Sequence, residues 1–195
     1  MSRSFPRVAV LISGGGTTLQ NLIDEIAAGR LAVSIALVVS SRADAYGLVR
    51  AANAGLPTMI VAPKPAQDFS DRVFGEVRKA NVTLVLCAGW LKRLTIPSDF
   101  HRRVLNIHPS LLPEFGGKGM YGRHVHEAVL AAGRTVSGCT VHYVNDEYDD
   151  GPILLQREVS IVDCATADEV AARVFEAERI AYPDAIRLSL GTTTP

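Results

Sequence analysis

Two side chains that could stabilise a developing negative charge lie two positions apart at the end of an apolar run. The run is Leu105-Asn106-Ile107-His108, and a loop begins at Pro109. In an extended segment, residues i and i+2 point to the same side, so the Asn106 amide and the His108 imidazole can converge on one atom. An amide donor beside an ionisable donor suits an oxyanion formed by attack on a carbonyl carbon. A strand end with a turn-forming asparagine and a structural histidine is the alternative for this pattern alone.

A turn rich in carboxylates follows a later apolar segment, and Asp149 is its candidate functional residue. Asp149 stands where the chain turns through Asp150-Gly151-Pro152, whereas most acids of this stretch are typical of a solvated turn. A carboxylate close to His108 would favour the imidazolium and raise the pKa of His108. We therefore expect His108 to be protonated near neutral pH and able to act as a general acid. His142, on the strand before this turn, is expected to point inward as a structural histidine.

A glycine-rich loop is the second candidate binding element. It reads Ser13-Gly14-Gly15-Gly16-Thr17-Thr18 and joins the first expected strand to the first expected helix. Glycines let the backbone approach a ligand closely, and a helix N-terminus offers unpaired N–H groups and a partial positive charge. The two threonine hydroxyls add donors for a phosphate. A tight turn with a threonine cap is the structural alternative.

Other nucleotide-binding patterns fit this chain less well. The spacing of Gly14 and Gly16 begins a dinucleotide fingerprint, but Leu19 stands at the third glycine position. The second expected strand ends in Ser40-Ser41-Arg42, where that fingerprint requires a ribose-binding carboxylate. The segment Gly116-Gly117-Lys118-Gly119 lacks both the spacing and the Ser/Thr of a P-loop. A single terminal phosphate therefore suits the loop better than a dinucleotide.

Composition narrows the class of protein. The 195 residues are 48% hydrophobic and 21% charged, which is typical of an ordinary globular domain. Basic and acidic residues number 20 each, without a basic tract, so we expect no nucleic-acid partner. The three cysteines are widely spaced, and no signal peptide or membrane-spanning segment is evident, which predicts a cytoplasmic protein without a membrane partner. The histidine spacing, including His124 and His126, matches no standard metal site, and we expect none.

Alternating strand and helix patterns predict an α/β fold with a doubly wound, mostly parallel sheet. The expected strands cover residues 7–13, 31–40, 58–61, 82–88, 104–107, 136–145 and 153–162. The expected helices cover residues 19–30, 45–53, 69–80, 125–132 and 167–190, the last interrupted at Pro183. The final two strands are expected to form a hairpin, which makes the C-terminal part of the sheet mixed. Without repeats or linkers, we expect a single domain over residues 1–190 and a disordered tail over 191–195.

With these segments in view, the chain resembles the phosphoribosylglycinamide formyltransferases, folate-dependent enzymes also called glycinamide ribonucleotide transformylases. The resemblance runs from about Val8 to Ile186 and includes, in order, ISGGGTTLQ, SSRADAYGL, LCAGWLKRL, LNIHPSLLP and GCTVHYVNDEYDDGP. It implies a Rossmann-like formyltransferase fold. It also implies transfer of the formyl group of 10-formyltetrahydrofolate, a co-substrate, to the amine of N1-(5-phosphoribosyl)glycinamide (GAR) in de novo purine (IMP) biosynthesis.

The same resemblance implies a catalytic role for Asn106, His108 and Asp149. The amine of GAR would attack the formyl carbon directly. Asn106 would hold the oxyanion, and His108 would stabilise it and help return a proton to the folate nitrogen. Asp149 would keep His108 charged and help organise a water that takes the amine proton.

Substrate-binding residues follow from the resemblance as well. Gly16, Thr17 and Thr18 would hold the phosphate of GAR, and Glu178 would contact its ribose. The residues that would bind folate are Leu91, Lys92, Arg93, Leu94, Asn106, Asn145, Asp146, Glu147, Tyr148 and Asp149.

Alternatives remain open at this point. Another formyl-folate enzyme, such as a formyltetrahydrofolate hydrolase, a nucleotide-sugar formyltransferase or methionyl-tRNA formyltransferase, would share the catalytic pattern. A non-catalytic folate- or nucleotide-binding module could keep the fold. The sequence leaves open a homodimer. We expect the glycine-rich stretch at 114–122, an insertion relative to the family pattern, to close over the active site as a lid.

Overall fold

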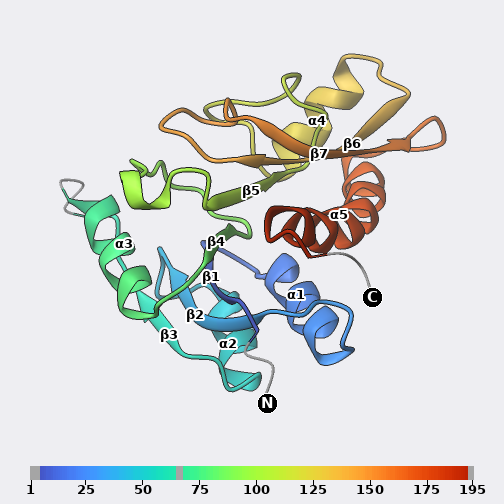
Figure 1. Ribbon diagram of the computed structural model, residues 1–195. Coiled ribbons are helices and arrows are strands. Elements are labelled where there is room, and N and C mark those ends of the chain that lie inside the picture. Colours follow the sequence, from blue (N-terminus) through green and yellow to red (C-terminus); the bar gives the residue numbers. More distant parts are fainter. Residues whose placement is uncertain (1–4, 65–67, 193–195) are drawn as a thin grey trace. The chain divides into compact units, whose positions relative to one another are not determined.

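The computed structural model describes residues 5–64 and 68–192, which form two compact units (Figure 1). The first unit extends to Leu105, and the second covers Asn106–Thr192. The boundary falls inside a strand, β5 (Val104–His108). A single domain over residues 1–190 stays a prediction. Of the expected tail, 193–195 lies outside the described residues, and the Thr192 N–H donates to the Arg187 carbonyl over 2.9 Å.

The first unit is built on parallel strands in the order β3-β2-β1-β4, next to which β5 begins. Their bounds are β1 (Arg7–Ile12), β2 (Ser34–Ser40), β3 (Thr58–Ile60) and β4 (Leu84–Cys87). In β1, Val10 pairs with Val38 of β2 on one side and with Leu86 of β4 on the other. Central parallel strands are buried on both faces, which is why β1 and β4 read as continuous apolar runs.

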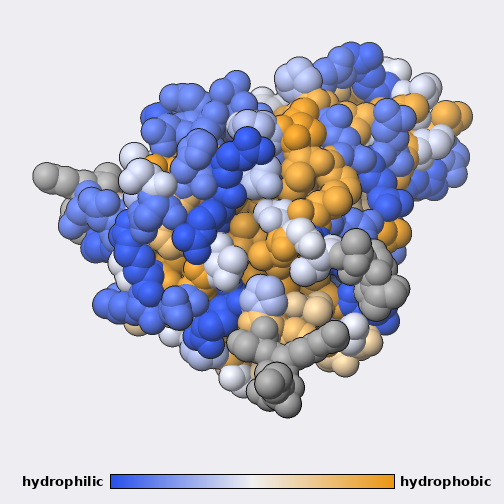
Figure 2. Space-filling model, viewed as in Figure 1, coloured by the Kyte–Doolittle hydropathy of each residue, from blue (hydrophilic) through white to orange (hydrophobic). Residues whose placement is uncertain are grey.

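Three helices connect these strands: α1 (Thr17–Ala27), α2 (Tyr46–Asn53) and α3 (Phe69–Lys79). A short 3₁₀ helix, η1 (Ser98–Phe100), precedes β5. Figure 1 shows α1 and α3 on opposite sides of the strands, as a doubly wound sheet requires. The outer face of α3 is hydrophilic (Figure 2), while its apolar stripe of Phe69, Val73, Phe74 and Val77 is buried.

The order of the strands in the first unit defines a switch point. From β1 the chain moves outward through β2 to β3 and then returns to β4 on the other side of β1. In open α/β sheets, ligands bind beyond the carboxyl ends of the strands at such a point. The glycine loop follows β1 there. Its Ser13 N–H donates to the Gly89 carbonyl after β4 over 3.1 Å.

The second unit contains the end of β5 followed by α4 (Arg123–Ala131), β6 (Val136–Tyr143), β7 (Ile153–Ser160) and α5 (Ala167–Ser189). Strands β6 and β7 are antiparallel, with a register shift between Val141 and His142. Helix α5 packs on both strands and on α4. Its buried positions include Val170, Val174 and Ala177, which recur at helical spacing.

The predicted fold class, a doubly wound and mostly parallel α/β sheet with a mixed C-terminal part, is confirmed. One detail is wrong, because α5 continues through Pro183 instead of being interrupted there. A proline removes one helical hydrogen bond, but Pro183 is buried in a long helix whose packing on β6 and β7 supplies most of its stability. At the start of α5, Thr166 and Glu169 form a capping box. Within residues 5–64 and 68–192, no helix is long and apolar enough to cross a membrane.

Candidate active site

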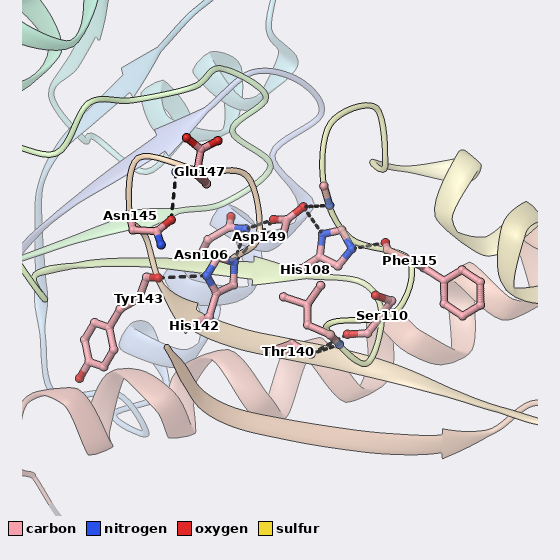
Figure 3. Close-up of polar contacts among 12 residues, drawn as sticks. Asn106, His108, Ser110, Phe115, Thr140, His142, Tyr143, Asn145, Glu147 and Asp149 are labelled. Carbon is pink, nitrogen blue, oxygen red and sulfur yellow. Dashed lines mark hydrogen bonds and ion pairs between the residues drawn. The ribbon is translucent and has the colours of Figure 1, made fainter. Parts of the chain in front are cut away.

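Asn106, His108 and Asp149 meet in the second unit (Figure 3). Asn106 and His108 lie two positions apart on β5, and their side chains point to the same side, as expected for a strand. Asp149 reaches them from the loop between β6 and β7. Its Oδ2 lies 3.5 Å from His108 Nδ1, and its Oδ1 accepts a 3.4 Å hydrogen bond from Asn106 Nδ2. The structure thus brings together the three residues to which the resemblance assigns catalysis.

His142 is a fourth member of this cluster, which the sequence did not predict. It is buried on β6, and its Nε2 lies 3.1 Å from Asn106 Nδ2 and 3.6 Å from Asp149 Oδ1. Its Nδ1 lies 3.1 Å from the Tyr143 carbonyl, which can only accept a hydrogen bond. A proton on Nδ1 therefore leaves Nε2 of the neutral ring as an acceptor for the Asn106 amide. His142 points inward as expected, and it also orients the amide of Asn106.

Both ring nitrogens of His108 face oxygen acceptors. Nε2 lies 2.8 Å from the carbonyl of Phe115, and Nδ1 faces Asp149. The shorter contact assigns the proton of the neutral imidazole to Nε2. Nδ1 is then the nitrogen that gains and loses a proton, and it faces the Asp149 carboxylate.

The pKa of His108 differs from the sequence-based expectation. Burial lowers the pKa of His108 below its ordinary value, although Asp149 and the Phe115 carbonyl act to raise it. The expectation of a raised pKa is therefore wrong. Only 4% of the His108 side chain is exposed, and the cost of placing a charge there outweighs the attraction of Asp149.

Asp149 is held as a carboxylate. Burial acts to raise the pKa of Asp149, but the nearby His142 ring, the charge of His108 and the Gly117 N–H together lower it below its ordinary value. Asp149 also has a positive φ of 55°, a conformation that favours glycine. Local backbone strain of this kind is found where surrounding contacts determine the position of a functional side chain.

The glycine-rich insertion supplies backbone groups to the cluster. The carbonyl of Phe115 contacts His108, and the N–H of Gly117 donates to Asp149 Oδ2 over 3.0 Å. Between them, Gly116 has no room for a side chain, because a Cβ would overlap Leu112 and lie 3.3 Å from the Asp149 Cβ. In the structure the start of the insertion thus contacts the cluster of Asn106, His108 and Asp149. Closure of the insertion as a lid stays a prediction.

A buried hydrogen-bond network anchors the loop that follows β5. Thr140 Oγ1, on β6, donates to the Ser110 carbonyl over 2.7 Å and accepts from the Leu112 N–H over 3.0 Å. The Ser110 hydroxyl donates to the Glu114 carbonyl over 2.7 Å. These bonds connect β5, β6 and the insertion, so they position His108 and the Phe115 carbonyl relative to each other (Figure 3).

The expected phosphate-binding residues lie at the start of α1 in the first unit. Gly16 precedes the helix with φ of 71°, and Thr17 and Thr18 are its first two residues. The N-cap position is held by Gly16, which has no side chain, so the alternative of a threonine cap is not formed. Thr17 and Thr18 lie at a helix N-terminus, which attracts anions.

The residues expected to bind folate are divided between the two units. Leu91, Lys92, Arg93 and Leu94 follow β4 in the first unit. Leu91 is 43% exposed, its N–H donates to the Ser13 hydroxyl over 3.1 Å, and Leu94 is buried. An open pocket of about 380 Å³ beside this segment is lined by Pro63, Phe69, Ser70, Lys92, Arg93 and Thr95.

The other expected folate residues, Asn106 and Asn145 to Asp149, belong to the second unit. The loop is ordered by its own polar contacts. Asn145 accepts a 3.0 Å hydrogen bond from the Glu147 N–H and donates to Asp150 over 3.2 Å. Tyr148 is 40% exposed and is available for contact with a ligand.

Glu178, expected to bind ribose, lies half-buried on α5. Burial raises the pKa of Glu178 to about 7. Cys139 of β6 lies close enough for the charge of Glu178 to add to the effect of burial, which raises the pKa of the thiol to about 12. A carboxyl with this environment can accept hydrogen bonds from a ribose diol when ionised.

Comparison with known proteins identifies the family. The formyl transferase family model matches residues 6–186. Phosphoribosylglycinamide formyltransferase of Haemophilus influenzae is 40% identical over 186 residues, covering 93% of this chain and 85% of the relative. The chloroplastic enzyme of that name from Arabidopsis thaliana is 38% identical, with 92% of this chain and 64% of the relative covered.

A solved structure and a larger relative extend the comparison. Glycinamide ribonucleotide transformylase 1 from Symbiobacterium toebii is 38% identical and superposes with a TM-score of 0.88, over 96% of this chain and 89% of that chain. The trifunctional purine biosynthetic protein adenosine-3 of Drosophila pseudoobscura is 40% identical, and the chain spans only 14% of its length. The family model, the relatives and the fold agree with the resemblance seen in the sequence, and the chain belongs to the formyl transferase family.

Proposed function

We propose that the protein transfers the formyl group of 10-formyltetrahydrofolate to the amine of GAR, a step of purine biosynthesis. The observation that carries the proposal is the cluster of Asn106, His108 and Asp149. The Asp149 carboxylate lies 3.4 Å from the Asn106 amide nitrogen and 3.5 Å from the His108 imidazole. Membership of the formyl transferase family and its relatives' names support the choice of donor and acceptor.

In the proposed mechanism, the amine of GAR attacks the formyl carbon directly. An N–H of Asn106 and the His108 imidazole stabilise the oxyanion of the tetrahedral intermediate. Asn106 Nδ2 faces His142 and Asp149, and its 3.4 Å contact with Asp149 is the longer of the two. We infer that this longer contact gives way to the oxyanion, while His142 keeps the amide oriented.

Proton movement follows from the environment of His108. Burial lowers the pKa of His108, so we infer that His108 becomes protonated as the negative charge of the intermediate forms beside it. The attacking amine loses one proton, by way of a water organised by Asp149, and His108 delivers one proton to the departing folate nitrogen. The carbon–nitrogen bond to folate breaks, and the proton count is unchanged over the cycle.

Substrate binding is proposed for both units. Gly16, Thr17 and Thr18 bind the phosphate of GAR, and Glu178 accepts hydrogen bonds from its ribose. Folate contacts the segment Leu91–Leu94 and the loop from Asn145 to Asp149. A cytoplasmic location stays a prediction of the sequence, which leaves a homodimer open.

The test is an absorbance assay of the purified protein with 10-formyltetrahydrofolate, with and without GAR. We expect loss of the formyl group only when GAR is present. Loss without GAR would identify a hydrolase instead. With a folded protein, no reaction under either condition would exclude GAR as the acceptor and leave a different acceptor or a binding module.

A further inference from the structure

The glycine loop is held from the side by helix α2, and these contacts are all within the first unit. The N–H of Gly47 donates to the Gly14 carbonyl over 3.0 Å. Arg50, one turn further along α2, donates from Nε to the Gly15 carbonyl over 2.9 Å. Two successive carbonyls of the loop therefore point toward α2.

The direction of these carbonyls determines where the loop's N–H groups point. In a trans peptide the C=O and the following N–H point in opposite directions. Since the carbonyls of Gly14 and Gly15 face α2, the N–H groups of Gly15 and Gly16 face away from it. Among the described residues, neither of these two N–H groups donates to a backbone carbonyl. Successive N–H groups that point to one side form a concave site for an anion.

The contact between α2 and the loop leaves no space for side chains. A Cβ on Gly16 would lie 2.6 Å from the Gly47 Cα. A Cβ on Gly47 would lie 3.2 Å from the Gly16 Cα and 2.6 Å from Cδ1 of Ile12 on β1. These two glycines are thus required by the close approach of two backbones, in addition to the φ of 71° at Gly16.

Arg50 is itself held in place by several partners. Its Nη1 donates to Gln20 Oε1 over 3.3 Å, and Gln20 in turn donates to Asp24 over 2.9 Å. The Arg50 guanidinium also lies 5.2 Å from the centre of the Tyr46 ring. A flexible surface arginine would not orient a peptide group, whereas this one is half-buried and restrained on three sides.

We propose that Arg50, with Gly47, is a positioning residue for binding of the substrate phosphate. By holding the Gly14 and Gly15 carbonyls, α2 turns the N–H groups of the loop toward the phosphate, and the cation of Arg50 adds to the positive potential there. This inference rests on the proposed function, because it takes the phosphate of GAR as the anion. It assigns a role in phosphate binding to Gly47, in the segment SSRADAYGL, and to Arg50 just after it, where the expected site had no member.

The test compares R50A and R50K with wild type on two acceptors, GAR and the same molecule without its 5′-phosphate. We expect both variants to raise the KM for GAR about ten-fold and to change kcat less than two-fold. Neither variant should change the kinetics with the phosphate-free acceptor. R30A is the matched control, because Arg30 is exposed and its side chain bonds to Glu25 of α1, away from the glycine loop.

Two results would overturn the inference. An equal loss with both acceptors would show a structural role without a link to the phosphate. A wild-type KM in R50K would show that charge alone suffices, since lysine cannot hold the Gly15 carbonyl and Gln20 with the same planar group.

A failure of the proposed function would be visible separately, as no turnover of GAR by wild type. Calorimetric binding of ribose 5-phosphate to wild type, R50A and R50K then decides the inference. A dissociation constant raised about ten-fold in both variants would support it, and equal binding, or no binding by wild type, would overturn it.

Discussion

At the scale of single residues, the charge state of His108 is the central property of the site. Replacing Asp149 with Asn removes the negative charge that acts to raise the pKa of His108. We expect D149N to lower the pKa of the His108 imidazole further, as measured by NMR titration of its ring. The control is D168N, because Asp168 is exposed and bonds to Arg123. An unchanged or raised pKa in D149N would contradict the role of Asp149.

Asn106 gives a second prediction at this scale. N106A removes the amide that we expect to stabilise the oxyanion, and loss of one such donor lowers kcat about 10²- to 10³-fold. The steady-state kinetics should show this fall in kcat with little change in the KM for GAR. N53A, at the exposed end of α2, is the control. A change in KM alone would mean that Asn106 binds substrate without stabilising the transition state.

At the scale of elements, the start of the insertion positions the catalytic cluster through its backbone. G116A places a Cβ against Leu112 and close to Asp149, so we expect the backbone next to the Phe115 carbonyl to shift and weaken its contact with His108. We expect kcat to fall about ten-fold or more and the free energy of unfolding to fall by about 1–3 kcal/mol. G75A, in α3, has space for the added methyl group and serves as control. Wild-type kcat in G116A would remove the insertion from the catalytic site.

Glu178 of helix α5 is the basis of a further prediction, because burial raises its pKa to about 7. A carboxyl with a raised pKa in the folded state binds more protons there than in the unfolded state, so stability decreases as the pH rises from about 4.5 to 7. We expect E178Q to be more stable than wild type at pH 8 by on the order of 1–2 kcal/mol and not at pH 4. Denaturant unfolding at both pH values measures this.

The control for Glu178 is E176Q, at an exposed position two residues earlier on the same helix. If Glu178 serves the ribose, E178Q should also raise the KM for GAR, which is the usual conflict between stability and function. A difference in stability that does not depend on pH would argue against a buried, ionising Glu178.

At the scale of the whole molecule, binding of GAR should stabilise the chain against unfolding. A ligand at about 100 times its dissociation constant adds about 2.7 kcal/mol to the free energy of unfolding. For a chain of this length we expect a rise in Tm of about 5–10 °C. Thermal unfolding is measured with GAR and with its phosphate-free analogue at the same concentration. An equal rise in Tm with both ligands would contradict phosphate recognition.

Much of the fold was predictable from local patterns. The strands and helices found here match the expected ones within a few residues, because apolar periodicity and glycine-rich turns are local properties of the chain. The continuity of α5 through Pro183 was not predictable, since it depends on the packing of the helix against β6 and β7. The proximity of Asn106 to His108 follows from strand geometry, whereas that of Asp149 came only from the family resemblance.

What the sequence by itself determined is the set of elements, the types of residue available for chemistry and the family to which the chain belongs. The tertiary structure alone decided that the pKa of His108 is lowered and that His142 orients the Asn106 amide. It also decided the backbone contacts of Phe115 and Gly117 with the cluster, and the hydrogen bond of Arg50 to the glycine loop. Burial and contacts between residues distant in the chain set these properties. Neither can be read from spacing along the sequence, because the same residue types at the same spacing can be solvated or desolvated, depending on what packs against them.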